Sequence, residues 1–232
     1  MRPPLTLGVL SEATAPTLRF LHDVQTAAAR AAPGARLRVI TDVNPALQDP
    51  ALSSARIGEA LAEAAGALRG AGAEVLALVS SSAHAHRSLI GRASGLPVAD
   101  MIGLAARAVR ERGVRRAGVL GPRPALRLYR EYLAAEAMGA VSLEPTRQEA
   151  FVESLQALAR DGASDGLREI FAGFAAELAT AGAEVVVLAA EELALVLRPE
   201  DVAVQLEDPA PRLARQCAAI CLGLEPSPAT EA

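Results

Sequence analysis

The sequence predicts an α/β protein made of two similar lobes, each with a parallel sheet flanked by helices, and with a cleft between the lobes. Short runs of branched apolar residues alternate with Ala-rich amphipathic stretches, a pattern typical of parallel strands joined by helices. The phrase AGAEV also occurs twice, beginning at Ala71 and at Ala181. In each copy a glycine is placed to end a helix before a buried strand. The offset from position 71 to position 181 is 110 residues, close to half of the 232-residue chain.

The strand predictions come from runs that would be buried on both faces of a parallel sheet. They cover 5–11, 36–42, 73–79, 115–121 and 183–189. Weaker strands are expected near 96–98, 141–143 and 202–206. The expected helices cover 16–32, 53–70, 101–112, 123–138, 147–159, 164–180 and 210–222. Strands that alternate with helices indicate right-handed crossover connections.

The repeat divides this pattern into two lobes. The first lobe is expected to contain 1–98 together with 208–222, and the second lobe 99–207. The tail 223–232 ends in the polar, Pro-containing stretch EPSPATEA, so we expect it to be disordered. Function in α/β proteins is usually found where buried strands end. We therefore expect the strands that finish at Val79 and Ala189 to face the cleft.

Composition argues against several classes of function. The formal net charge is −4 and aromatic residues make up 3% of the chain, which disfavours a nucleic-acid partner. The sequence has no lysine, which excludes both the Schiff base of a pyridoxal phosphate enzyme and the usual P-loop. No apolar run has the length of a membrane span, and the start MRPPLTLGVL does not have the pattern of a signal peptide. We expect a cytoplasmic protein without a membrane partner.

Cys217 and Cys221 are the two cysteines of the chain. They are spaced i, i+4 on a predicted helix and therefore share one face. We interpret them as small apolar residues that pack inward, rather than as half of a metal site.

Motifs at the predicted strand ends point to a known family. In chain order they are TDVNP at 41–45, VSSSAH at 79–84, GVRRAGVLGPR at 113–123, AAEE at 189–192 and VQLEDPAPRLA at 204–214. In order and spacing, this set resembles the aspartate/glutamate racemase superfamily over nearly the whole chain. The resemblance implies a protein without a cofactor, with two α/β lobes and one catalytic cysteine at a strand end of each lobe. It also implies a homodimer, which a composition rich in Ala and Leu favours as well.

The sequence departs from this family at both cysteine positions. The family's first signature, Cys-Thr-Asn-Thr-x-His, puts Val79 at the cysteine, and a shift of one or two residues would offer Ser80 or Ser81 instead. The second signature, Gly-Cys-Thr-Glu, puts Ala190 at the cysteine. A thiol with a pKa of about 8.5 can be tuned into a base at neutral pH, whereas an unactivated hydroxyl cannot. We therefore expect that the two-thiol racemization does not run in this chain.

The acid/base candidates are His84 and Glu191. His84 falls on the family's histidine, and imidazole can act as acid or base near neutral pH. Glu191 replaces the family's Thr, and burial would raise the pKa of its carboxyl group towards neutral. Because a carboxylate repels an anion, Glu191 weakens the expectation that the substrate is an acidic amino acid. The candidate ligand-binding residues are Ser11, Asn44, Ser80, Ser81, Ser82, Arg123 and Glu192.

Each candidate also has an ordinary structural interpretation. The serines suit a polar turn before a helix, Glu191 suits the first turn of a helix, and Arg123 suits an exposed turn. His84 and His86 have a spacing that can hold a metal, but no third ligand is identifiable, so no metal is predicted. His22 lies within a predicted helix and is given no role.

Two functions remain open at this point. The first is an isomerase or lyase that acts on a small carboxylate or carbonyl compound through non-thiol acid/base groups. The second is a non-catalytic racemase-like protein that binds a small ligand or a partner. Loss of both thiols favours the second function. Polar groups at both strand ends favour the first, which is our preferred hypothesis.

Overall fold

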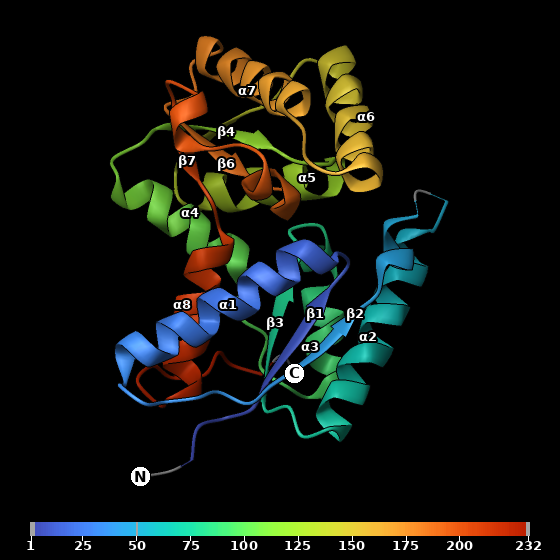
Figure 1. Cartoon of the computed structure of the whole chain (residues 1–232), viewed down its shortest axis with the longest axis vertical. Coiled ribbons are helices and arrows are strands. Elements are labelled where there is room, and N and C mark those ends of the chain that lie inside the picture. Colours follow the sequence, from blue (N-terminus) through green and yellow to red (C-terminus); the bar gives the residue numbers. More distant parts are fainter. Residues whose placement is uncertain (1–2, 50, 231–232) are drawn as a thin grey trace. The chain divides into compact units, whose positions relative to one another are not determined.

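The computed structural model describes residues 3–49 and 51–230, which form two compact units. The first unit takes the described residues up to Met101 together with those from Ala210, and the second unit is Ile102–Pro209. Each unit is a parallel sheet flanked by helices (Figure 1), so the predicted α/β class is confirmed. No helix in the described ranges is both long and apolar enough to cross a membrane.

The first unit has a three-stranded sheet in the order β2-β1-β3. Its strands are β1 (Leu7–Ser11), β2 (Val39–Val43) and β3 (Val75–Val79). Its helices are α1 (Thr14–Ala31), η1 (Pro45–Gln48), α2 (Ser54–Gly70), η2 (Ala83–His86), α3 (Arg87–Ser94) and α8 (Ala210–Cys221). The crossovers from β1 to β2 and from β2 to β3 run in opposite directions along the sheet, so right-handed connections put α1 and α2 on opposite faces. α8 packs beside α1 (Figure 1).

The second unit has a four-stranded sheet in the order β5-β4-β6-β7. Its strands are β4 (Arg116–Leu120), β5 (Gly139–Val141), β6 (Val185–Leu188) and β7 (Gln205–Glu207). Its helices are α4 (Met101–Glu111), α5 (Arg123–Ala135), α6 (Pro145–Asp161), α7 (Asp165–Thr180), η3 (Glu191–Leu195) and η4 (Pro199–Asp201). α4 and α5 pack against Val119, Val185 and Val187, whereas α6 and α7 pack against the alternate residues Leu120, Val186 and Leu188. This alternation buries the sheet on both faces.

Two elements differ from the sequence predictions. α3 was not predicted, because it is only eight residues long and offers a short periodic pattern. It ends at Gly95, which has φ 64°, a conformation that favours glycine. The weak strand expected at 96–98 is reduced to a single bridge between Val98 and Leu76. The tail expected to be disordered forms no helix or strand over 226–230, and its last two positions lie outside the described residues.

The two AGAEV phrases end their helices in the same way. Gly72 has φ 98° and Gly182 has φ 93°, so both occupy the left-handed region that favours glycine. The amide of Ala73 donates to the Leu68 carbonyl at 2.9 Å, and the equivalent bond in the second unit is 3.0 Å long. These bonds satisfy carbonyl groups at the helix C-terminus and turn the chain directly into β3 and β6.

The glutamate of each phrase binds the start of the neighbouring strand. A carboxylate oxygen of Glu74 accepts a hydrogen bond from the amide of Thr6 at 2.8 Å. The carboxylate of Glu184 accepts from the amides of Arg115 and Arg116 at 2.9 and 3.0 Å. The repeated phrase is therefore a structural element that ends a helix and aligns two strands.

The 110-residue offset also holds for strand register. β1 pairs with β3 from Leu7 opposite Val75, and β4 pairs with β6 from Ala117 opposite Val185. Each residue of the second pair is 110 positions after its counterpart. By the same offset, Ser80 after β3 corresponds to Ala190 after β6.

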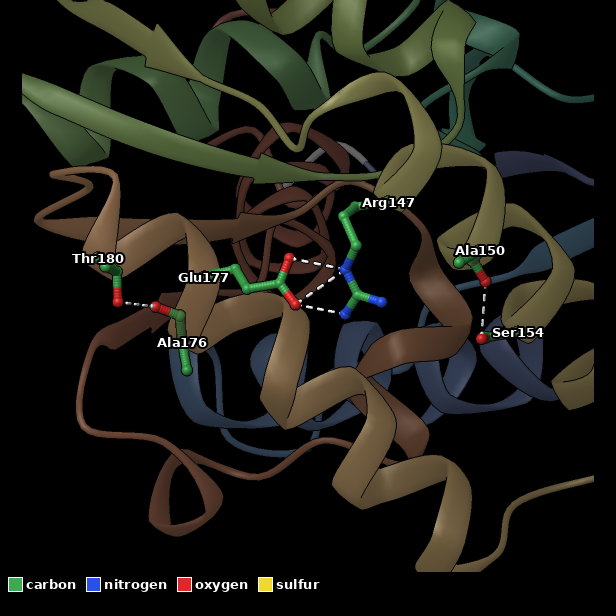
Figure 2. A network of polar contacts seen from close by, with 6 residues as sticks. All are labelled: Arg147, Ala150, Ser154, Ala176, Glu177 and Thr180. Atoms are coloured by element: carbon green, nitrogen blue, oxygen red, sulfur yellow. Dashed lines mark hydrogen bonds and ion pairs between the residues drawn. The ribbon is translucent and has the colours of Figure 1, made fainter.

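α6 and α7 are joined by an aromatic core and a surface ion pair. Phe151 makes edge contacts with Phe171 and Phe174 at centroid distances of 5.9 and 5.6 Å. The Arg147 guanidinium lies 4.7 Å from the centre of the Phe174 ring, and its Nε is 2.9 Å from Oε2 of Glu177 (Figure 2). This planar pair fixes the guanidinium above the ring and stabilises the contact between the two helices.

Candidate functional site

Polar residues gather where the strands of the first sheet end. Because parallel strands end at the same edge of a sheet, the residues that follow β1, β2 and β3 lie together there. The Ser11 carbonyl accepts a hydrogen bond from the amide of Asn44 at 3.0 Å. The Ser11 hydroxyl is 3.3 Å from the Val79 carbonyl. The structure thus brings Ser11, Asn44 and the end of β3 together.

Ser80 contacts a carboxylate that sequence reasoning missed. Ser80 is buried, and its hydroxyl donates to Oε2 of Glu12 at 3.1 Å. The same hydroxyl accepts a hydrogen bond from the amide of Ala83 at 3.1 Å. Glu12 directly follows β1 and is half-buried. An acidic residue immediately after a buried strand is the signal that would have identified it.

The internal repeat favours Ser80 over Val79 as the counterpart of the family's first cysteine. The resemblance puts the second cysteine at Ala190, and the strand register relates Ala190 to Ser80. The shifted match at Ser80 therefore fits the fold better than the unshifted match at Val79. Val79 is the last residue of β3 and is buried in the sheet.

His84 is held by backbone groups on both sides of its ring. Its Nδ1 lies 2.8 Å from the Ser80 carbonyl, and its Nε2 lies 3.2 Å from the amide nitrogen of Met101. Because the amide can only donate, Nε2 is the acceptor, and Nδ1 carries the proton that binds Ser80. Burial lowers the pKa of His84, so the imidazole is neutral at pH 7.

The hydrogen bonds of His84 restrict its chemistry. A neutral imidazole of this tautomer can accept a proton only at Nε2. That atom already accepts a hydrogen bond from the Met101 amide. Its contacts therefore favour a role in positioning the turn after β3.

The remaining polar residues near this turn differ in burial and contacts. Ser81 is fully buried, whereas Ser82 is half-buried and its hydroxyl makes no capping bond to η2. His86 turns towards α2, where its Nε2 is 3.4 Å from the Ser54 hydroxyl. Across the described chain, no three His, Cys, Asp or Glu side chains form a group that could hold a metal ion.

The second unit presents a different set of groups at its strand ends. Glu191 and Glu192 form the first turn of η3, directly after Ala190, and both are half-buried. Gly121 directly follows β4. It lies so close to Ala189 that a Cβ at position 121 would be 2.6 Å from the Ala189 carbonyl oxygen. The Gly121 carbonyl accepts from the side-chain amide of Gln148 at 2.9 Å.

Arg123 is the most exposed of the candidate ligand-binding residues. It begins α5, its side chain is 72% exposed, and its guanidinium lies 3.7 Å from Glu149. This environment matches the surface interpretation of the residue. A ligand contact by Arg123 remains a prediction.

The two cysteines belong to α8 of the first unit. Cys221 accepts a hydrogen bond at its carbonyl from the amide of Leu5, at the amino end of β1 and therefore at the opposite edge of the sheet from Ser80. Burial, with a smaller contribution from the charge of Glu74, raises the pKa of the Cys221 thiol to about 12. Burial also raises the pKa of the Cys217 thiol. Neither thiol is poised to act as a base at neutral pH.

Comparison with known proteins agrees with this architecture. The model of the Asp/Glu/Hydantoin racemase family matches residues 7–217, and the chain belongs to that family. No curated protein sequence matches the chain.

Solved structures show the same fold at low sequence identity. An aspartate racemase homologue from Pyrococcus horikoshii OT3 is 21% identical, with a TM-score of 0.71 over 94% of this chain and 99% of that one. Glutamate racemase from Francisella tularensis, in complex with D-glutamate, is 13% identical, with a TM-score of 0.70 over 95% and 82%. Unliganded arylmalonate decarboxylase is 17% identical, with a TM-score of 0.54 over 97% of both chains. At these identities the likeness concerns the fold.

Proposed function

We propose that the protein is an enzyme of the isomerase or lyase type that acts on a small carboxylate or carbonyl compound by acid/base chemistry without a thiol. One observation supports this proposal above all others. The strand ends at which the resemblance expects thiols carry polar and ionisable groups instead, with Ser80 after β3 and Glu191 after Ala190. The thiols of the chain are buried in α8 and have raised pKa values.

The chemistry asked of such an enzyme is proton transfer at an activated carbon atom. A carboxylate can accept a proton from carbon when a neighbouring carbonyl group stabilises the resulting enolate. Glu191 and Glu192 begin η3 and make up the acidic first turn of that helix. We assign Glu191 as an acid/base group of the second unit. His84 was the candidate in the first unit, but its two backbone hydrogen bonds favour positioning of the Ser80 turn.

Hydrogen–deuterium exchange at carbon tests the proposal. Thermal shift against amino acids, dicarboxylates, hydantoins and arylmalonates first identifies compounds that stabilise the native protein. Those with an acidic carbon–hydrogen bond are then incubated with the protein in deuterium oxide and followed by NMR. Exchange that falls by about 100-fold or more in Glu191→Gln supports acid/base catalysis by this residue. Stabilising ligands without any exchange would contradict the proposed enzyme.

The Glu191 assignment has its own control. Asp161→Asn changes an exposed carboxylate of the same unit that pairs with Arg160, and exchange should continue at the wild-type rate. Exchange undiminished in Glu191→Gln would refute the role of Glu191. His84→Ala should affect exchange together with stability, because it removes a group that fixes the turn after β3.

A non-catalytic binding protein is the second candidate function. It is favoured by the way in which Ser11, Ser80 and His84 already form hydrogen bonds within the protein. Groups that are held by hydrogen bonds within the protein can line a binding surface without supplying a reactive atom. A ligand that raises the melting temperature and exchanges no proton would favour this function.

A further inference from the structure

Glu12 and Ser80 form a side-chain pair that joins the ends of β1 and β3. The two residues are 68 positions apart in sequence, and the Ser80 hydroxyl donates to Oε2 of Glu12 at 3.1 Å. Ser80 is itself buried, and its hydroxyl accepts a hydrogen bond from the amide of Ala83. Two independent bonds therefore fix the Ser80 hydroxyl, and that hydroxyl fixes the carboxylate.

The position of this pair is what gives it chemical meaning. Ser80 corresponds through the 110-residue repeat to Ala190. Ser80 directly follows β3, and Ala190 is the second residue after β6. A hydroxyl at that position is not a base at neutral pH. A carboxylate that accepts a hydrogen bond from it can act as a base, because carboxylates are ionised at neutral pH and a hydroxyl donor favours the charged form.

We propose that Glu12 is the catalytic base of the first unit and that Ser80 is its positioning residue. This inference rests on the proposed function, which requires a non-thiol base but does not name one in this unit. The observation behind it is the Ser80–Glu12 hydrogen bond at the strand end, together with the commitment of both His84 ring nitrogens to backbone groups.

The proton transfer is balanced without any further reactant. A carboxylate oxygen of Glu12 takes the proton from the carbon next to a carbonyl group, so one O–H bond forms and one C–H bond breaks. The electron pair of the broken bond moves into the carbonyl group and gives an enolate. Return of a proton to the same carbon regenerates the carbonyl compound and the carboxylate. In deuterium oxide the protonated carboxyl group exchanges its proton with solvent before the return, so the atom returned to carbon is deuterium.

The charge of Glu12 also indicates what kind of compound suits this position. A dianion would be repelled by the carboxylate in its resting, ionised state. A neutral carbonyl compound has no such penalty, and a hydantoin with one substituent at carbon 5 is a suitable neutral probe with an acidic carbon–hydrogen bond.

The test measures the exchange of this probe in four proteins. The wild type, Glu12→Gln, Ser80→Ala and Glu59→Gln are incubated with 5-methylhydantoin in deuterium oxide, and NMR gives the rate above the protein-free rate. Glu59 is the matched control, because it is an exposed carboxylate of the same unit that pairs with Arg56 on α2. Circular dichroism and melting temperature establish that each variant is folded.

The inference predicts a loss of at least about 100-fold in Glu12→Gln, a smaller loss in Ser80→Ala, and no change in Glu59→Gln. Ser80→Ala should also shift the acid limb of the pH–rate profile, because the hydroxyl favours the charged carboxylate. Wild-type exchange that persists in folded Glu12→Gln would overturn the role of Glu12 and leave the proposed function standing. No exchange above the protein-free rate in the wild type, for this probe and for every ligand found by thermal shift, would overturn both.

Discussion

Replacing His84 by Leu should destabilise the protein at neutral pH and flatten the dependence of its stability on pH. The ring joins the Ser80 carbonyl to the Met101 amide at 2.8 and 3.2 Å. Without it, two buried backbone groups lose their partners, at about 1–3 kcal/mol each. We therefore expect a loss of about 2–6 kcal/mol in the free energy of unfolding at pH 7.5.

The pH dependence follows from the direction of the pKa shift. Burial lowers the pKa of folded His84 below the unfolded value of 6.5, so the unfolded chain binds more protons between these two values. The stability contributed by the neutral ring is complete above pH 6.5 and is lost as the pH falls from there through the folded pKa. Over that window a single group gives a slope approaching about 1.4 kcal/mol per pH unit.

Urea unfolding followed by circular dichroism between pH 5.0 and 8.0 measures both effects. His22→Ala is the control, because it also removes a histidine and the side chain of His22 is exposed on α1. His86 also has a pKa lowered by burial, so His84→Leu should remove part of the slope. The account would be refuted if His84→Leu left the free energy of unfolding unchanged at pH 7.5. It would also be refuted if the free energy of unfolding of this variant changed with pH below 6.5 as steeply as that of the wild type.

Three further predictions concern packing, thiol chemistry and assembly. Gly121→Ala should destabilise the second unit by about 1–3 kcal/mol, because its Cβ would lie 2.6 Å from the Ala189 carbonyl oxygen. Gly173→Ala is its control on α7, where a Cβ meets no atom within 4 Å. This variant should gain up to about 1 kcal/mol in the free energy of unfolding. Equal urea midpoints for the two variants would contradict the close contact at Gly121. Cys217 and Cys221 should react with a disulfide reagent at neutral pH at least about 100-fold more slowly in the native protein than in urea, because burial raises both pKa values, and fast native labelling would contradict their burial. The homodimer expected from the family resemblance predicts twice the mass of the chain in light scattering at micromolar concentration, and a monomer there would remove it.

The parts of the fold that the sequence predicted are those in which local chemistry decides the structure. β3 and β6 are apolar on both faces, and each follows a glycine with positive φ. No long-range information is needed to recognise such a strand. α3 escaped prediction because eight residues with a glycine at position 91 form too short a periodic pattern. Val98 forms one bridge to Leu76 where a strand was expected, because pairing depends on the available partner.

The site was less predictable because its contacts join distant parts of the chain. The turn Ser80–His84 was found from its position after a strand and from the family resemblance. The partner of Ser80 is Glu12, at the end of another strand, and periodicity cannot reveal that pairing. The tautomer of His84 is fixed by the amide of Met101, which also lies outside the motif. Residue types at a strand end are thus readable from sequence, whereas the hydrogen bonds that set their chemistry are not.

Proton exchange by a protein without cysteine tests the central claim most directly. Cys217 and Cys221 are replaced together by Ala, and the double variant is checked for folding by circular dichroism, because both side chains are buried. It is then incubated in deuterium oxide with the carbon acids that stabilise the wild type. Our account predicts exchange at the wild-type rate, since acid/base chemistry is assigned to carboxylates at the strand ends. Loss of exchange in the folded double variant would contradict it, because a thiol would then be required.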